Sequence, residues 1–274
     1  MTLTLLPALL MLLSGSIHAV VNAMIKGGGN RMIQMALSSG AGTLIALPFV
    51  PFVPLPDGSW VWLVCATAIH LVYFYCLVRA FDAGDLSAAY PIFRGLAPLL
   101  STLMAVTVLH ETVTVQTVAG IVLIGCGMFA MVLGRHVNRA TLLWSLATGV
   151  LIALYTVVDA VGVRAAPTPF SFIVWLFLMM GIASMTILPL FVGAASAPAI
   201  KAQWKSGAIA GLLSFATFGL ALYALAHGPT GPLSALRETG MVTALLISIF
   251  VLKEPVTPAR IAAILAICAG AIII

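Results

Sequence analysis

One stretch of about 45 residues occurs twice in this chain, and the duplication constrains the fold more than any other feature. Residues 87–131 and 230–274 align without a gap at an offset of 143 positions. Three polar residues of the first copy align with the same residue types in the second: Arg94 with Arg237, Glu111 with Glu254 and Thr114 with Thr257. Each copy predicts an apolar helix, a short polar turn and a second apolar helix. The chain is therefore expected to consist of two related halves.

The amino-acid composition indicates whether this chain folds in water or in a lipid bilayer. Of the 274 residues, 62% are apolar and 7% are charged, whereas soluble domains carry roughly 25% charged residues. A helix that crosses a bilayer needs about 20 apolar residues, and polar or Gly/Pro turns divide this chain into ten such segments. The sequence predicts one all-α membrane domain over residues 1–274, with ten transmembrane helices. The first eight are expected near residues 3–24, 32–50, 59–81, 86–109, 113–133, 141–163, 170–192 and 206–226, and the last two within residues 230–274.

The first helix of each half also matches. Aligning residues 20–23 with residues 157–160 pairs Asn22 with Asp159 and His18 with Tyr155. The two repeats then cover residues 3–134 and 140–274. Since five crossings bring the second copy in from the opposite side, the two five-helix repeats are expected to be inverted. Inverted repeats are a recurring plan of secondary transporters, which alternate access around a site between the repeats.

Basic residues indicate the orientation. The turns after the odd-numbered helices contain Lys26, Arg31, Arg79, Arg135, Arg139, Lys201, Lys205, Lys253 and Arg260, and the opposite turns contain Arg164. The positive-inside rule makes the first set cytoplasmic. We therefore expect a multi-pass protein of the plasma (inner) membrane with both termini outside.

The sequence motifs argue against several functional classes. The net charge of +5 comes from turns beside apolar segments, so no nucleic-acid partner is expected. The four cysteines have no CxxC spacing, and neither GxSxG nor HExxH occurs. The sequence predicts no enzyme, no metal site, no cofactor and no nucleotide-driven pump, and it leaves the oligomeric state open.

The paired turns resemble a known family. Residues 109–114 read LHETVT and residues 252–257 read LKEPVT, each before a helix rich in small residues. These hairpins resemble the EamA repeat of the drug/metabolite transporter superfamily, over essentially the whole chain. The resemblance implies an exporter of amino acids, including aromatic ones, or of other metabolites and drugs. Glu111 and Glu254 themselves are expected to form caps or local salt links for the helices that follow them.

Four ionisable residues lie inside the expected helices or near a kink: Arg94, Asp159, Arg237 and Glu238. A charge at the bilayer centre costs about 2.5–3.5 kcal/mol, so such residues face protein or water. Two interpretations stay open. The four charges sum to zero and could simply hold helices together. Alternatively, Arg94 or Arg237 clamps a substrate carboxylate, Asp159 accepts an ammonium group or a proton, and Glu238 is a partner charge.

Further residues are candidates for the same chamber. The substrate-binding candidates are Tyr73, Tyr90, Tyr155, His18 and Asn22, with Tyr75, Phe215 and Phe218 as further aromatics that could stack on a substrate. Pro91, Pro98, Gly231 and Pro232 would soften two helices and are gate candidates, although ordinary kinks would look the same.

The sequence therefore predicts a secondary transporter, an amino-acid exporter first, with a proton as a candidate coupling ion. A transporter of drugs or of phosphorylated or phosphonate metabolites is the alternative within this class. A channel or a structural subunit is the alternative from a different class.

Overall fold

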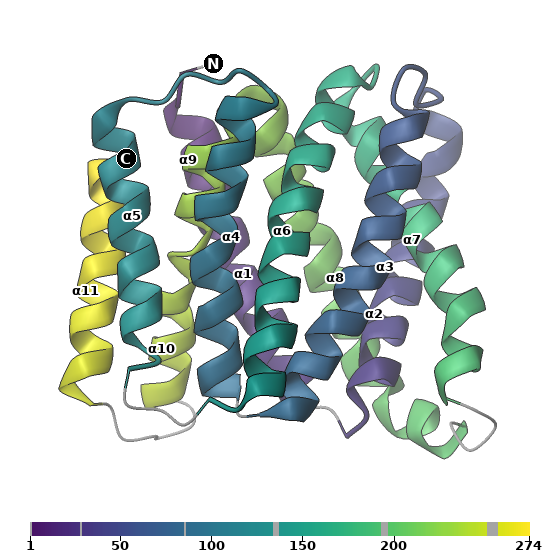
Figure 1. Cartoon of the computed structure of the whole chain (residues 1–274). Coiled ribbons are helices and arrows are strands. Elements are labelled where there is room, and N and C mark those ends of the chain that lie inside the picture. The colour runs from purple at the N-terminus through teal and green to yellow at the C-terminus, as the bar shows by residue number, and fades with distance from the viewer. Residues whose placement is uncertain (1, 28, 85, 134–136, 193–196, 251–256) are drawn as a thin grey trace.

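Every regular element in the described part of the chain is helical. The computed structural model describes residues 2–27, 29–84, 86–133, 137–192, 197–250 and 257–274. In chain order the elements are α1 (Leu5–Gly27), α2 (Arg31–Ala46), the 3-10 helix η1 (Leu47–Phe52), α3 (Trp60–Ala83), α4 (Leu86–Thr107), α5 (Val115–Ala130), α6 (Arg139–Ala165), α7 (Pro169–Val192), α8 (Ala197–His227), α9 (Thr230–Arg237), α10 (Gly240–Phe250) and α11 (Pro258–Ile273). Figure 1 shows them as one bundle whose helices run between two ends.

Among the described residues, seven helical segments are long and apolar enough to cross a membrane. They belong to α1, α2 with η1, α3, α4, α6, α7 and α8. Helices satisfy their own backbone hydrogen bonds, which is what a lipid environment requires. The expectation of an all-helical membrane protein is therefore confirmed. The expected count of ten crossings is reached only if α5, α11 and the α9–α10 pair cross as well, and α5 and α11 have 16 residues each.

The ninth predicted helix is interrupted. It ends as α9 at Arg237 and resumes as α10 at Gly240, so the structure has two short helices where the sequence predicts one. Helix α1 crosses closely at this break, because a Cβ atom at Gly15 would collide with the Arg237 carbonyl and one at Gly240 would collide with Gly15. The eighth helix also differs from the prediction, since α8 begins at Ala197, nine residues before the expected Ser206.

The two halves interlock instead of forming separate bundles. Helix α1 packs mainly on α8, α9 and α10 of the second half, and α6 packs mainly on α3 and α4 of the first. Equivalent helices run in opposite directions: in Figure 1, α1 descends from the end that carries the N-terminus, while α6 ascends toward it. The first helix of each half is thus surrounded by the third and fourth helices of the other half.

Helices α5 and α11 meet through small residues in a symmetric way. Gly120 packs against the Gly270 backbone, and Gly127 packs against the carbonyl of Ala263. The 143-residue offset exchanges these two contacts, since it carries Gly120 to Ala263 and Gly127 to Gly270. The symmetry seen in the sequence is therefore present in the packing at this edge.

Threonines, and not Glu111, cap the helices after the repeated turns. The Thr114 hydroxyl accepts a hydrogen bond from the Thr117 amide at 3.1 Å, and that of Thr257 accepts one from the Arg260 amide at 3.4 Å. This is standard N-cap geometry. The expected local role of Glu111 is therefore corrected, because its carboxylate contacts residues of α6 and α9 instead. Glu254 lies outside the described residues, as do Arg135 and Lys253.

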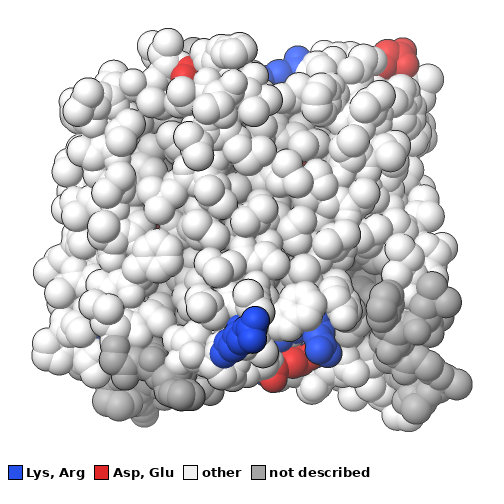
Figure 2. Space-filling model, viewed as in Figure 1, with Lys and Arg blue, Asp and Glu red and all other residues white. Residues whose placement is uncertain are grey.

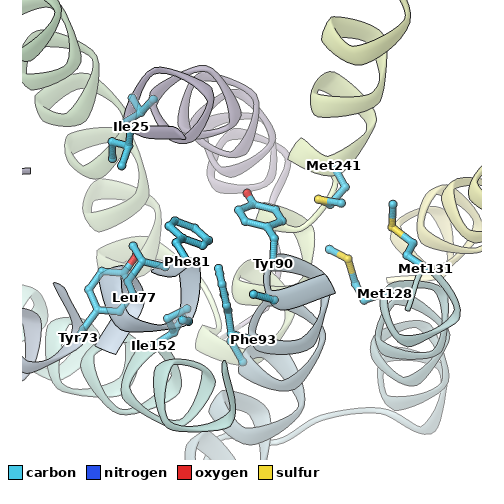
Figure 3. Packing of buried hydrophobic residues seen from close by; sticks show 14 of the residues in the cluster. Ile25, Tyr73, Leu77, Phe81, Tyr90, Phe93, Met128, Met131, Ile152 and Met241 are labelled. Carbon is cyan, nitrogen blue, oxygen red and sulfur yellow. The ribbon is translucent and has the colours of Figure 1, made fainter. Parts of the chain in front are cut away.

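Buried side chains from both halves share one core. Figure 3 shows Leu77 and Phe81 of α3 beside Phe93 of α4, with Ile152 of α6 and Met241 of α10 in the same cluster. On the outer surface, charged side chains gather near the two ends of the visible face and an uncharged band lies between them (Figure 2). This distribution suits a bundle whose middle faces hydrocarbon.

Candidate functional site

The four predicted charged residues meet at one place. Arg94 of α4, Asp159 of α6, Arg237 at the end of α9 and Glu238 just after it line a cavity of about 20 Å³. Each is at most 8% exposed. The cavity lies where α9 stops, and the interruption after Arg237 leaves Glu238 outside a continuous helix. We refer to these four residues and their cavity as the charged site.

Arg94 and Glu238 form an ion pair. Their Nε and Oε2 atoms are 2.8 Å apart, and both side chains are 3% exposed. The guanidinium of Arg94 also lies 5.6 Å from the centroid of the Tyr90 ring. In low dielectric such a pair offsets the cost of burying each charge alone. The negative charge of Glu238 therefore offsets the positive charge of Arg94.

Arg237 has no such partner among the described residues. Its Nε and Nη2 atoms are buried without a hydrogen-bond acceptor, and its guanidinium lies 4.9 Å from the centroid of the Phe218 ring. A buried arginine with open donors is costly unless an anion occupies the site. A carboxylate that reached these two N–H groups could accept a hydrogen bond from each, since arginine binds carboxylates through paired donors.

Asp159 faces a histidine that was not among the predicted site residues. Oδ2 of Asp159 lies 3.8 Å from Nε2 of His70, and Oδ1 is buried without a donor. Nδ1 of His70 is 2.9 Å from the Ala66 carbonyl, and a carbonyl only accepts, so Nδ1 carries a hydrogen. In neutral His70 the lone pair of Nε2 therefore faces the carboxylate. This contact becomes favourable when one proton is placed between them, and Asp159 is otherwise open to a cation.

The sequence contained a signal for His70. The residue is fully buried in the apolar helix α3, and an ionisable residue at that depth is a functional candidate by default. Its neighbour in space is Tyr155, whose ring stacks on the imidazole at a centroid distance of 4.2 Å. Only the packing of α3 on α6 reveals that His70 and Asp159 meet.

The remaining predicted residues belong largely to a second cavity of about 50 Å³. His18, Asn22 and Tyr73 line it, whereas Tyr155 lines the charged site. Phe218 lines both cavities. We call the second one the aromatic cavity, because Tyr73, Phe74, Phe177 and Phe218 form much of its wall.

Tyr90 connects α4 to α1. Its hydroxyl, which points toward α1 in Figure 3, accepts a hydrogen bond from Nδ2 of Asn22 at 3.0 Å. Two of the other predicted aromatics lie elsewhere: Phe215 packs against Phe177 at 4.9 Å between centroids, and Tyr75 is exposed beside Trp144. The structure thus joins most of the predicted residues around Phe218 and leaves Tyr75 at the periphery.

Both cavities are small. At about 20 and 50 Å³ they have room for water molecules, whereas ligand pockets span roughly 300–1,000 Å³. An organic molecule would enter only after the helices around Phe218 move apart.

The predicted gate residues lie on the two helices beside the charged site. Helix α4 is continuous across Pro91 and Pro98, and Thr102 donates a hydrogen bond to the Pro98 carbonyl at 2.7 Å. Gly231 and Pro232 lie in the first turn of α9, and a Cβ at Gly231 would press against Thr102. The interruption of the helix is at its other end, after Arg237.

A polar network closes the bundle at the end that carries the N-terminus. The Glu111 carboxylate accepts hydrogen bonds from the Thr230 amide at 2.7 Å and from Nη1 of Arg164 at 2.8 Å. Arg164 also donates to the carbonyls of Leu225 and Gly228. This network fixes the start of α9 to the ends of α6 and α8. Among the described residues, no group of three or more His, Cys, Asp or Glu is placed to hold a metal ion.

Comparison with known proteins gives two positive results. A model of the EamA-like transporter family matches residues 5–133 and residues 139–274. A solved structure titled "Crystal structure of protein" aligns with 98% of this chain and 94% of that chain at a TM-score of 0.79 and 17% sequence identity. At that identity the likeness shows the fold alone. No curated protein matches the chain.

Proposed function

The chain belongs to the EamA-like transporter family, and we propose that it is a secondary transporter that exports amino acids, including aromatic ones. The family establishes a membrane transporter of small molecules. In the proposed topology α5, α11 and the α9–α10 pair complete ten crossings, in two inverted repeats of the plasma membrane with both termini outside. Alternating access opens the charged site to one side at a time.

The observation that carries the proposal is the pair of open polar groups in one cavity. Arg237 offers unpaired donors and Asp159 an unpaired acceptor, and both line the charged site. An amino acid at neutral pH carries a carboxylate and an ammonium group, which complement these two residues. Arg94 is a weaker candidate for the carboxylate clamp because Glu238 already neutralises it. Of the two predicted arginines, we therefore assign the clamp to Arg237.

The substrate side chain would lie in the aromatic cavity. Phe218 lines both this cavity and the charged site, and rotation of its ring is the movement we propose to join the two. Tyr73, Phe74 and Phe177 would then surround an apolar or planar side chain. His18 and Asn22 supply polar groups at the same wall. This arrangement favours aromatic over small amino acids.

Asp159 is also the proposed proton site. With Nδ1 of His70 committed to Ala66, a proton held between Nε2 and Asp159 would satisfy both atoms. An arriving ammonium group would compete with that proton for the carboxylate. Exchange of one proton for one amino-acid molecule follows, and it would couple export to a proton gradient.

The test is transport by the purified full-length chain in liposomes. Proteoliposomes loaded with phenylalanine, alanine, an organic phosphate or a cationic drug are assayed for efflux, with and without a pH gradient. We expect phenylalanine efflux that Arg237→Met and Asp159→Asn each reduce at least tenfold. Matched controls are Arg79→Met and Asp57→Asn, which change the same residue types away from the charged site.

Other outcomes select among the alternatives. Efflux of the phosphate or the drug in place of amino acids would show that the protein is a transporter with a different class of substrate. If both site variants transport normally but unfold at lower temperature, the buried charges only hold helices together. Ion currents without saturable efflux would indicate a channel.

A further inference from the structure

A separate hollow lies on the outer surface of the bundle, away from both cavities. It is a groove of about 600 Å³ between α2, α7 and α8, a volume within the range of ligand pockets. Its floor and walls include Gly40, Leu44, Gly181, Ile182, Trp204 and Ala208. We call it the α2–α7–α8 groove.

Small residues create the depression. Gly181 packs against the Thr43 side chain and Gly40 against that of Met185, so the surface of α2 and α7 is low along this line. The two threonines of the groove are already satisfied. Thr43 donates a hydrogen bond to the Phe177 carbonyl at 2.8 Å and Thr186 donates one to the Ile182 carbonyl at 3.0 Å. The groove therefore fits an apolar occupant.

The walls of the groove face outward. Leu44 is 70% exposed and Ile182 is 55% exposed. Both lie on segments that are long and apolar enough to cross a membrane. In a transporter of this family the medium that touches such side chains is hydrocarbon, and the matching apolar object at hand is a lipid acyl chain.

Two lysines of α8 lie near Trp204, which lines the groove. Nζ of Lys205 lies 5.8 Å from the centroid of the Trp204 ring, and Lys201 precedes Trp204 by three residues, which places it on the same face of α8. Both lysines are exposed, and neither forms an ion pair with a described carboxylate. Tryptophan is enriched at the level of lipid headgroups. Two cations thus lie next to an interfacial ring that lines an apolar groove.

We propose that the α2–α7–α8 groove binds one anionic phospholipid. Its acyl chain lies along Trp204 and Ala208 toward Leu44, and its headgroup phosphate lies against Lys201 and Lys205. Since α2 belongs to the first half and α7 and α8 to the second, the lipid chain contacts both halves where they meet. This site is independent of the proposed substrate.

The test uses two photoactivatable lipids with identical diazirine-bearing acyl chains, one with a phosphatidylglycerol and one with a phosphatidylcholine headgroup. The full-length protein is reconstituted with a trace of either lipid, illuminated, digested and mapped by mass spectrometry. We expect labelling concentrated on peptides that contain Leu44, Ile182 and Ala208. Phosphatidylglycerol should label them more strongly, and loss of each lysine should weaken that preference by about fivefold.

Three variants separate the parts of the proposal. Ala208→Trp fills the groove from an exposed position and should abolish the concentrated labelling, while Ile209→Trp on the adjacent exposed face should not. Lys201→Gln with Lys205→Gln should make the two lipids label equally. An unchanged thermal unfolding midpoint shows that each variant is folded.

Three results would overturn the inference. Labelling spread over all outward-facing helices in proportion to their exposure would contradict a specific lipid site in the groove. Equal labelling of the unmodified protein by both lipids would contradict the proposed preference for an anionic headgroup. Absence of lipid from the groove together with cross-links between two protein copies would assign the surface to self-association.

Discussion

The two copies of the repeat agree at the edge of the molecule and differ at its centre. At the edge, Thr114 and Thr257 cap equivalent helices, and Gly120 and Gly127 make contacts that the repeat exchanges. At the centre, Arg94 lies in a continuous helix and is followed by Gly95, which packs closely on α5, whereas Arg237 ends a helix and is followed by Glu238. The contacts at the edge are symmetric, whereas the shared arginines at the centre have different surroundings.

This contrast explains why equivalent arginines have different surroundings. Glu238 aligns with Gly95, so the first copy has no carboxylate at this position, and Glu238 pairs with the arginine of the opposite half. That pairing leaves Arg237 with open donors. A symmetric pair of arginines has thus become one structural and one available residue.

The largest effect should come from breaking the central ion pair. Arg94→Met leaves Glu238 buried and unpaired, which should lower the free energy of unfolding by about 3–5 kcal/mol. Arg237→Met removes a charge that has no described ion-pair partner and should change it far less. Thermal and denaturant unfolding in detergent measure both. The double variant Arg94→Met with Glu238→Met should recover most of the loss, and equal losses for the two arginines would contradict the comparison.

A second prediction concerns a substitution that gives the interrupted helix the residue found at the aligned position of α4. Gly240 aligns with Ala97 of α4, and Gly240→Ala would press a methyl group onto the backbone at Gly15. We expect a loss of about 2–3 kcal/mol in the free energy of unfolding from overpacking. Ala97→Gly is the matched control; since Ala97 is fully buried, it should cost about 0.5–1 kcal/mol through helix propensity and about 0.8 kcal/mol through the lost methyl group. If Gly240→Ala is neutral, the α1 crossing is not what requires the glycine.

A third prediction concerns the polar network at the start of α9. Glu111→Gln keeps an acceptor for the Thr230 amide but loses the charge that Arg164 contacts. The free energy of unfolding should fall by about 1.5 kcal/mol, the lower range for hydrogen bonds to charged groups. Hydrogen exchange of the Thr230 amide should speed up while that of Thr117, at the cap of α5, does not. Equal changes at both amides would mean a global effect.

The smallest effect should be the most symmetric. Thr114→Ala and Thr257→Ala each remove an N-cap hydrogen bond, worth about 1 kcal/mol. We expect nearly equal losses of unfolding free energy for the two variants, with unchanged transport. Unequal losses would show that the two edges differ in spite of the shared geometry.

Most of the scaffold could be predicted from the sequence, and less of the site. The offset of 143 residues identified the paired hairpins, and the burial of Arg94, Asp159, Arg237 and Glu238 followed from their position in apolar segments. The sequence offered no basis for choosing which arginine Glu238 would neutralise. It also did not bring His70 to Asp159, because they lie on separate helices, α3 and α6, whose contact depends on how the halves interlock.

The predicted continuous ninth helix and the predicted local role of Glu111 were both wrong at places where the chain contacts segments that are distant in the sequence. The interruption after Arg237 lies where α1 crosses at Gly15, more than two hundred residues away in the chain. Glu111 looked like a local cap, yet the Thr114 hydroxyl occupies that role and the carboxylate bonds to the amide of Thr230 on α9.

The sequence by itself determined the solvent, the helical class, the duplication and the presence of buried charges, because each follows from composition or spacing along the chain. Only the tertiary structure decided which charges are neutralised, which are open and where the cavities lie. Those features depend on distances of a few ångströms between side chains of different helices. They are set when the first helix of each half packs into the other half.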